Sequence, residues 1–384
     1  MPFEFATAGR IVFGDGAASE VAPAAAAMGR RALLVTGQGT ERAAALARAL
    51  EAAGVVAVPF RVSGEPSIGT IAAGAAYARG EGCDVVVAMG GGSAIDAGKA
   101  LAVMLTNPGE PLDYLEVVGR GQPLRQPSAP FIAVPTTAGT GSEVTRNAVL
   151  AAPERGVKAS LRSPFLLARL AVVDPELTLD LPPALTASTG LDALTQLIEP
   201  YVSVRANAMT DLHAAEGLRT AGASLPRAWA NGGDRDARRG MCWASLLGGL
   251  SLANAGLGAV HGFAAPVGGM FPAPHGAVCA ALLAPAIAIN VEALRRRAPE
   301  SRALGRYDEV ARLLTGKSHA TADDGIEWIA ALCRRFEIPA LRAYGVTAND
   351  IPLLASRAAE ASSMKGNPIK LTREELEEII GRAI

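Results

Sequence analysis

Three side chains in the second half of the 384-residue sequence could together bind a metal ion. Asp192 lies in an apolar helical pattern at residues 189–195, and His261 and His275 lie in apolar, glycine-rich surroundings. A buried carboxylate or neutral imidazole needs a hydrogen-bond partner or a metal. One carboxylate and two imidazoles suit a first-row divalent ion and leave positions open for a substrate oxygen. Each side chain taken alone is also compatible with a hydrogen-bonded core residue.

A glycine-rich turn could bind the phosphates of a cofactor. Three glycines at residues 90–92 are followed by Ser93, and Asp96 lies one turn further along. Backbone without side chains can approach a phosphate closely, and a helix N-terminus presents unpaired N–H groups. A tight turn in which Ser93 caps the helix would explain the same residues, and the spacing is not G-x-G-x-x-G.

A second loop, rich in hydroxyl groups, strengthens the prediction of a dinucleotide site. It contains two glycines and the side chains of Thr136, Thr137, Thr140 and Ser142. Loops that follow adjacent strands of an open parallel sheet meet in one crevice. The alternative is a turn whose Thr and Ser residues serve local hydrogen bonding.

The first half of the chain alternates short aliphatic runs with helical patterns, which predicts a parallel sheet covered by helices. A helix is expected at residues 93–104, and strands are expected at residues 32–35, 55–58, 84–87 and 131–134. After residue 182 the strand-like runs vanish. We therefore predict a Rossmann-like α/β dinucleotide-binding domain over residues 1–180 and an all-helical metal-binding and substrate domain over residues 181–384. The spacing of Thr372 and Glu375 predicts a capping box before the last helix.

Composition excludes several classes of protein. Lysine and arginine total 36 against 37 acidic residues, so no basic surface is expected for nucleic acid or an acidic membrane. The longest apolar stretches, at residues 246–260 and 278–289, are interrupted by Asn254 and Pro285 and fall short of a bilayer span. Four widely spaced cysteines and an N-terminus without an export signal predict a soluble, cytoplasmic protein with reduced thiols.

In their order along the chain, these motifs resemble those of the iron-containing alcohol dehydrogenase family. The resemblance spans nearly the whole sequence and rests on residues 90–99, 135–143, 173–177, 189–195, the segments around His261 and His275, and residues 365–368. It implies a dinucleotide-binding N-terminal domain and an all-helical C-terminal domain, the architecture shared with dehydroquinate synthase. A catalytic metal would lie in the cleft between the two domains.

The resemblance also implies roles for single residues. The cofactor pyrophosphate would lie on the glycine loop, at Gly91, Gly92 and Ser93, with Asp96 nearby. Further cofactor contacts would come from Thr136, Thr137, Thr140, Ser142 and Lys158. Asn147 and Leu252 match positions that line the substrate pocket in relatives.

The metal ligands of the family are an aspartate, a histidine four residues later, and two histidines fourteen residues apart. Asp192, His261 and His275 match three of these, and we expect them to be the catalytic residues. The fourth position is Gln196, whose carbonyl oxygen binds a divalent ion more weakly than imidazole does. Iron or zinc is therefore expected. Where many relatives carry a further histidine near the substrate, this chain has Ala265, so the proton would leave through water or the cofactor ribose.

The choice of nicotinamide cofactor depends on the end of the first predicted strand. Many NAD-preferring relatives have an aspartate there, which pairs with the ribose 2′-hydroxyl. This chain has Gly37, followed closely by Thr40 and Arg42. Without the carboxylate a 2′-phosphate is not repelled, so we predict that the cofactor is NAD or NADP.

The expected reaction is reversible hydride transfer between NAD(P) and a small alcohol, with the metal polarising the oxygen of the aldehyde or ketone. A homodimer or higher homo-oligomer is expected, because relatives range from dimers upward. The alternatives are an enzyme resembling maleylacetate reductase, a lyase resembling dehydroquinate synthase, and a non-catalytic dinucleotide-binding protein with a degenerate metal site. Gln196 and Ala265 favour the last of these. The apolar segments around the predicted ligands argue against the charged substrate of the lyase.

Overall fold

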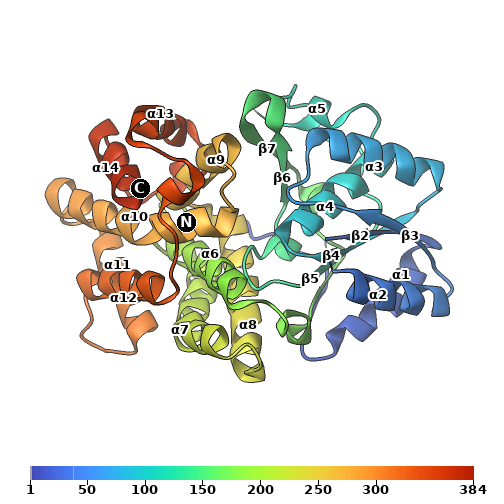
Figure 1. Ribbon diagram of the computed structural model, residues 1–384, viewed down its shortest axis with the longest axis horizontal. Coiled ribbons are helices and arrows are strands. Elements are labelled where there is room, and N and C mark those ends of the chain that lie inside the picture. The colour runs from blue at the N-terminus through green and yellow to red at the C-terminus, as the bar shows by residue number, and fades with distance from the viewer. Residues whose placement is uncertain (1, 38, 117) are drawn as a thin grey trace. The chain divides into compact units, whose positions relative to one another are not determined.

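The computed structural model describes residues 2–37, 39–116 and 118–384, which form two compact units (Figure 1). The α/β unit comprises residues 6–137 and 141–178. The helical unit comprises the N-terminal residues through Phe5, residues 138–140 and residues 179–384. The chain therefore passes into the helical unit after Thr178, close to the boundary predicted at residue 180.

A six-stranded parallel sheet forms the centre of the α/β unit, in the order β1-β8-β5-β4-β2-β3. Its strands are β1 (Ile11–Phe13), β2 (Arg31–Thr36), β3 (Val56–Arg61), β4 (Val85–Gly90), β5 (Phe131–Pro135) and β8 (Leu170–Val173). The predicted parallel α/β fold is confirmed, although the sequence pattern does not predict β1 and β8. Pro59 is tolerated within β3 because β3 is an edge strand, paired with β2 on one side and with no other described strand of this sheet.

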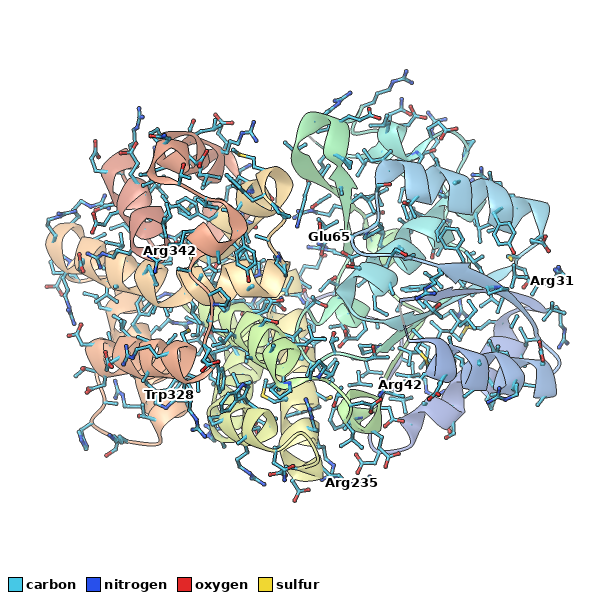
Figure 2. All side chains as sticks on the ribbon, viewed as in Figure 1. Arg31, Arg42, Glu65, Arg235, Trp328 and Arg342 are labelled. Atoms are coloured by element: carbon cyan, nitrogen blue, oxygen red, sulfur yellow. The ribbon has the colours of Figure 1, made fainter. Side chains whose placement is uncertain are left out.

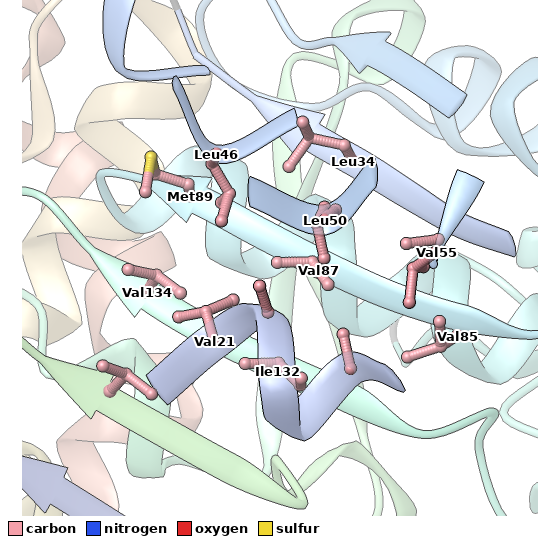
Figure 3. Close-up of a cluster of buried hydrophobic side chains, with 14 of the residues drawn as sticks. Val21, Leu34, Leu46, Leu50, Val55, Val85, Val87, Met89, Ile132 and Val134 are labelled. Carbon is pink, nitrogen blue, oxygen red and sulfur yellow. The ribbon is translucent and has the colours of Figure 1, made fainter. Parts of the chain in front are cut away.

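Helices cover both faces of the sheet. On one face α1 (Val21–Met28) and α2 (Thr40–Ala52) pack over alternate residues of the strands (Figure 3). This cluster includes Val21, Leu34, Leu50, Val87 and Ile132. Alternate side chains of a strand point to opposite faces. The remaining strand residues therefore point to the other face, which α3 (Ile68–Gly80) and α4 (Gly92–Thr106) cover.

The packing of α4 against the sheet is unusually close at one glycine. A Cβ added at Gly98 would lie 2.5 Å from the Cβ of Ala88 in β4 and 2.8 Å from the ring of Phe131 in β5. The absence of a side chain therefore brings the first turns of α4 down onto the two strands that carry the predicted cofactor loops. The unit is completed by α5 (Pro111–Tyr114) and by an antiparallel pair, β6 (Asn147–Ala152) and β7 (Val157–Arg162).

Within its described residues, the helical unit contains long helices and no strand. They are α6 (Pro183–Val202), α7 (Ala208–Ala230), α8 (Arg235–Ala255), α9 (Ala259–Met270), α10 (His275–Arg297), α11 (Arg302–Thr315), α12 (Ala322–Arg335), α13 (Ile351–Glu360) and α14 (Arg373–Ala383). The predicted capping box is confirmed, since the Glu375 N–H donates to Thr372 Oγ1 at the start of α14.

One helix is longer and more apolar than the sequence pattern indicates. By length and composition α10 could cross a membrane, and α8 with α9 could do so only as a pair bent by 97°. However, 72% of the apolar window of α10 is buried in the structure. This burial is typical of a core helix. The prediction that these stretches are too short for a span is wrong for α10, because the helix continues through Pro285.

Candidate metal centre and cofactor loops

The predicted cofactor loops lie where the order of the parallel sheet reverses. From β2 the chain moves to one edge through β3, then returns to the other side of β2 to form β4, β5 and β8. Gly37 follows β2, and the glycine loop follows β4. A Cβ on Gly90 would lie 3.4 Å from the nitrogen of Gly37, so the two turns are neighbours. Such a switch point is the usual place for a dinucleotide in an open parallel sheet.

The start of α4 has the form of an anion site. Gly91 is the N-cap of this helix, and no side chain among the described residues caps it. Ser93 lies inside the first turn, so the alternative in which Ser93 caps the helix is wrong. Helix α4 has 15 residues. The N–H groups of its first turn and the positive end of its dipole therefore face the glycine loop, in which Ser93 is the first residue with a side chain.

The threonine loop lies beside the glycine loop. The Thr136 N–H donates to the Gly90 carbonyl (2.9 Å), and a Cβ on Gly91 would lie 3.5 Å from the hydroxyl of Thr137. Thr136 and Thr137 are half-buried. The predicted contact residue Thr140 belongs to the short segment 138–140, which the structure assigns to the helical unit.

Asp96 and Ser142 belong to a buried polar network around Lys99. The Lys99 ammonium donates to Ser142 Oγ (2.8 Å) and Thr145 Oγ1 (2.7 Å), and Ser142 Oγ donates to Asp96 Oδ1 (2.5 Å). Burial lowers the pKa of Lys99 to about 8, against the attraction of Asp96 and Glu143. Burial raises the pKa of Glu143 to about 7. In this structure Asp96 and Ser142 therefore hold the two cofactor loops together.

Two basic residues near the predicted ribose region already have partners. Lys158 Nζ forms an ion pair with Glu65 Oε1 (2.5 Å), and Arg42 donates from Nη1 to the Leu177 carbonyl (2.7 Å); Figure 2 labels Glu65 and Arg42. The side chain of Thr40 lies outside the described part of the structure. A Cβ on Gly37 would meet nothing within 4 Å. Among the described residues, no atom therefore occupies the space beside Gly37, and this position itself carries no carboxylate.

The two predicted substrate residues are placed in different units. Asn147 begins β6, and its carbonyl accepts a hydrogen bond from Lys99 (2.9 Å). Leu252 is half-buried near the end of α8 in the helical unit. The described contacts therefore connect Asn147 to the polar network around Lys99 through its backbone carbonyl.

The structure brings the three predicted metal ligands together inside the helical unit. Asp192 lies in the middle of α6, His261 in the first turn of α9, and His275 at the first residue of α10. Asp192 Oδ1 lies 3.5 Å from His261 Nε2 and 3.7 Å from His275 Nε2. The close start of α10 depends on Gly276, because a Cβ there would lie 2.7 Å from the Ser188 carbonyl oxygen of α6.

Two oxygen atoms in this region, Asp192 Oδ1 and Gln196 Oε1, are buried. Neither has a hydrogen-bond partner among the described residues. A buried acceptor without a partner is costly. Gln196 is 3% exposed and lies one turn after Asp192 on α6. The donor set and the two unpaired oxygens fit a divalent cation, and they argue against a degenerate site.

The cluster contains two further residues, Cys279 and Glu199, that the sequence motifs do not predict. Cys279 lies one turn after His275 on α10, and its sulfur is within 4.8 Å of the ligand atoms of Asp192, His261 and His275. The spacing of four from His275 on a helix could have identified it. Glu199 lies seven residues after Asp192, on the same face of α6.

Glu199 fixes the orientation of His261. The His261 Nδ1–H donates to Glu199 Oε2 (2.7 Å), and the Val260 N–H donates to Glu199 Oε1 (2.7 Å). In the neutral imidazole, a proton on Nδ1 leaves a lone pair on Nε2, the nitrogen that faces Asp192. Gly258 makes room for this arrangement, since a Cβ there would lie 3.0 Å from Glu199 Oε1. A carboxylate behind a histidine ligand is a common device for orienting it.

The charges of the cluster favour a cation. Burial raises the pKa of Asp192, but the histidines outweigh it, so that this pKa lies below its usual value. The electrostatic interaction with Cys279 raises the pKa of His275 to about 9; burial opposes this rise, and Asp192 adds to it. Burial lowers the pKa of His261, but Cys279 and Glu199 outweigh it. Such a site holds protons until a metal ion displaces them.

Together, the two sites define a class of protein: a dinucleotide-dependent oxidoreductase with a metal centre. Residues 8–175 match the domain described as iron-containing alcohol dehydrogenase, and residues 186–384 match the C-terminal domain of the Fe-containing alcohol dehydrogenase family. The chain therefore belongs to the iron-containing alcohol dehydrogenase family, as the resemblance predicted.

Individual relatives match over nearly their whole length. The chain is 36% identical over 377 residues to alcohol dehydrogenase 4 of Saccharomyces cerevisiae, covering 97% of this chain and 96% of that one. It is 34% identical over 381 residues to the NAD-dependent methanol dehydrogenase of Bacillus methanolicus, covering 97% of both. The crystal structure of a 1,3-propanediol oxidoreductase matches with a TM-score of 0.92 and 35% identity over 100% of both chains. The protein is thus a nicotinamide-dependent enzyme of alcohol and aldehyde interconversion.

Proposed function

We propose that this enzyme interconverts a small primary or secondary alcohol and its aldehyde or ketone, by hydride transfer to or from NAD or NADP. The observation that supports this most directly is the cluster in the helical unit. There, Asp192 Oδ1 is buried and unpaired among the described residues, and it faces Nε2 of both His261 and His275.

The residues of the cluster would hold a divalent ion, iron or zinc, as ligands through Asp192, His261 and His275. Such an ion acts as a Lewis acid that polarises a carbonyl and stabilises an alkoxide. Glu199 keeps the proton of His261 on Nδ1, so that Nε2 remains a donor atom. The side chain of Ala265 on α9 cannot accept a proton, so the hydroxyl proton of the alcohol passes to water or to the cofactor ribose.

The α/β unit would bind the cofactor at the switch point of its sheet. The N-terminus of α4 and the backbone of Gly91 and Gly92 would hold the pyrophosphate. Thr136 and Thr137 lie next to this loop and offer hydroxyl donors. Gly37 carries no carboxylate, and no atom of the described residues lies within 4 Å of a Cβ added there, which supports acceptance of NADP beside NAD.

The names of two of the relatives reported above indicate small alcohols as their substrates. Methanol and 1,3-propanediol are both short and uncharged, and they stand in the names of relatives that match almost the whole chain. The apolar segments around the ligands favour such substrates over anionic ones. We therefore place short, uncharged alcohols and their aldehydes first among the candidate substrates.

A panel assay tests this proposal. Purified enzyme, stripped of metal and reloaded with iron, zinc or manganese, is given short alcohols and aldehydes with NAD or NADP, and nicotinamide absorbance is followed. Turnover should need the metal and fall with chain length and charge. Full activity of the metal-stripped protein would count against the proposal. So would the absence of activity with every metal and substrate tested.

We also propose a homo-oligomer in the cytoplasm. None of the four cysteines forms a disulfide within the described structure, which suits a reducing compartment. Val204, Met209 and Leu212 expose apolar surface at the start of α7, and a second copy of the chain could cover it. Light scattering of the purified protein tests the assembly, and fractionation of the source cells tests the compartment.

A further inference from the structure

We propose that Cys279 is a ligand of the metal ion and replaces the histidine that the family has where this chain has Gln196. The consequence is a thiolate centre that selects zinc over iron. This inference rests on the proposed function, because it concerns the same ion. It adds to the proposed function a fourth protein ligand of the ion and the identity of the metal.

The position of Cys279 supports direct ligation. Its sulfur lies 3.7 Å from His275 Nε2 and 3.9 Å from His261 Nε2, and the side chain is fully buried. Cys279 follows His275 by one turn of α10, so both side chains point to the same side of the helix. Asp192 Oδ1, unpaired among the described residues, completes the group within 4.8 Å.

The spacing of the donor atoms matches a tetrahedral ion. With zinc bonds of about 2.3 Å to sulfur and about 2.0 Å to nitrogen and oxygen, tetrahedral edges are roughly 3.5 Å for S–N and roughly 3.3 Å for N–O. The corresponding distances here are 3.7 and 3.9 Å for S–N, and 3.5 and 3.7 Å for N–O. Octahedral edges with bonds of about 2.1 Å would be roughly 3.0 Å, shorter than every one of these.

Gln196 is the competing fourth donor. Its amide oxygen is neutral and binds first-row ions more weakly than a thiolate does. A site of Asp192, Cys279 and two neutral imidazoles carries two negative charges, which balance a divalent cation in a buried site. The site then has four protein ligands, as in the family. The fourth ligand is Cys279 on α10 instead of a residue at position 196 on α6.

The nature of the donor determines which metal is bound. Thiolate and imidazole ligands in tetrahedral arrangement favour zinc, and at a given site zinc also binds more tightly than iron(II). We therefore expect the enzyme to acquire zinc when both metals are supplied equally.

Cobalt substitution tests the ligand directly. A thiolate bound to cobalt(II) gives an intense near-ultraviolet charge-transfer band, which oxygen and nitrogen ligands do not give. The full-length protein is loaded with cobalt as wild type, as Cys279→Ser and as Cys279→Ala, with Cys242→Ser as the matched control at another buried cysteine. Thermal melting verifies that each variant is folded.

Wild type and Cys242→Ser should bind one cobalt and show the band. Both Cys279 variants should lose the band and bind cobalt at least about tenfold more weakly in competition with a chelator. Stoichiometric cobalt without the band in wild type, or a band that persists in Cys279→Ser, overturns the thiolate ligand and leaves the proposed function intact. A folded wild type that binds no metal overturns both.

Two further measurements separate Cys279 from Gln196 and identify the metal. Gln196→Ala should keep the band and change cobalt affinity by no more than about twofold. Protein produced with equal iron and zinc should carry mostly zinc, and Cys279→Ser should carry a larger share of iron. Loss of affinity only in Gln196→Ala, or equal metal content in wild type and Cys279→Ser, contradicts the proposal.

Discussion

Replacing Glu199 by glutamine should weaken metal binding without removing a ligand. The carboxylate accepts hydrogen bonds from His261 Nδ1 and from the Val260 N–H, both at 2.7 Å. Glutamine can still accept from Val260, but its NH₂ group then faces the Nδ1–H of His261. The imidazole avoids this clash of donors by moving its proton to Nε2, the atom that faces Asp192. A protonated Nε2 has no lone pair for a metal.

The size of the effect follows from what is lost. Removal of a partner that orients a histidine ligand costs about 10- to 100-fold in metal affinity, which is about 1.4 to 2.8 kcal/mol at about 1.4 kcal/mol per tenfold. Fold stability should also fall by about 1.5 to 3 kcal/mol, the value of one hydrogen bond to a charged group. A merely structural role would lower stability and leave metal affinity unchanged.

Competition with a chromophoric chelator measures the metal affinity, and urea unfolding measures the stability. Glu309→Gln is the matched control, because Glu309 is exposed and accepts a hydrogen bond from the Tyr201 hydroxyl (2.6 Å). It should change metal affinity by no more than about twofold. If folded Glu199→Gln binds metal as tightly as wild type, Glu199 does not control the tautomer of His261.

Three more predictions concern the two units. Gly37→Asp should raise the KM for NADP at least about tenfold more than the KM for NAD, because a carboxylate would repel the 2′-phosphate; steady-state kinetics with both cofactors checks this, and equal changes contradict it. His275→Ala should abolish turnover and leave cofactor affinity, measured by nucleotide fluorescence, close to that of wild type. The Glu143 carboxyl should make the protein less stable as pH rises from about 4.5 to about 7, because its raised pKa lets the folded state keep a proton that the unfolded state releases. Glu143→Gln should remove up to about 1.4 kcal/mol per pH unit of that slope in urea unfolding, and an unchanged slope would show that another group titrates.

Features determined by residues close together in sequence could be predicted from the sequence. The aliphatic runs that become β2, β4 and β5, the helix after the glycine loop and the capping box at Thr372 all have their signal within a few residues. The strands β1 and β8 have no such local signal. Their stability comes from pairing across the chain, as between Ile11 and Ala171, and runs of three and four residues show no period of their own.

The metal centre shows the same limit. Asp192, His261 and His275 could be selected because acids and imidazoles are rare in apolar segments, and the resemblance to a family placed them in order. Cys279 could not be selected in that way, because free cysteine is common among the buried residues of apolar cores. Only the packing of α10 beside α6 shows that its sulfur faces the same point as Asp192.

That packing also explains how a ligand can change helices while the centre stays in place. The aspartate is fixed by α6, and the start of α10 is held close to α6 at Gly276, where a side chain would meet the Ser188 carbonyl oxygen. A donor one turn along either helix can therefore reach the same ion, at position 196 from α6 or at position 279 from α10. Because His261 is held separately by Glu199, the exchange requires no change in the other ligands. If Cys279 is the fourth ligand, as proposed above, this chain keeps four donors without a histidine at position 196, and its thiolate determines which metal the site selects.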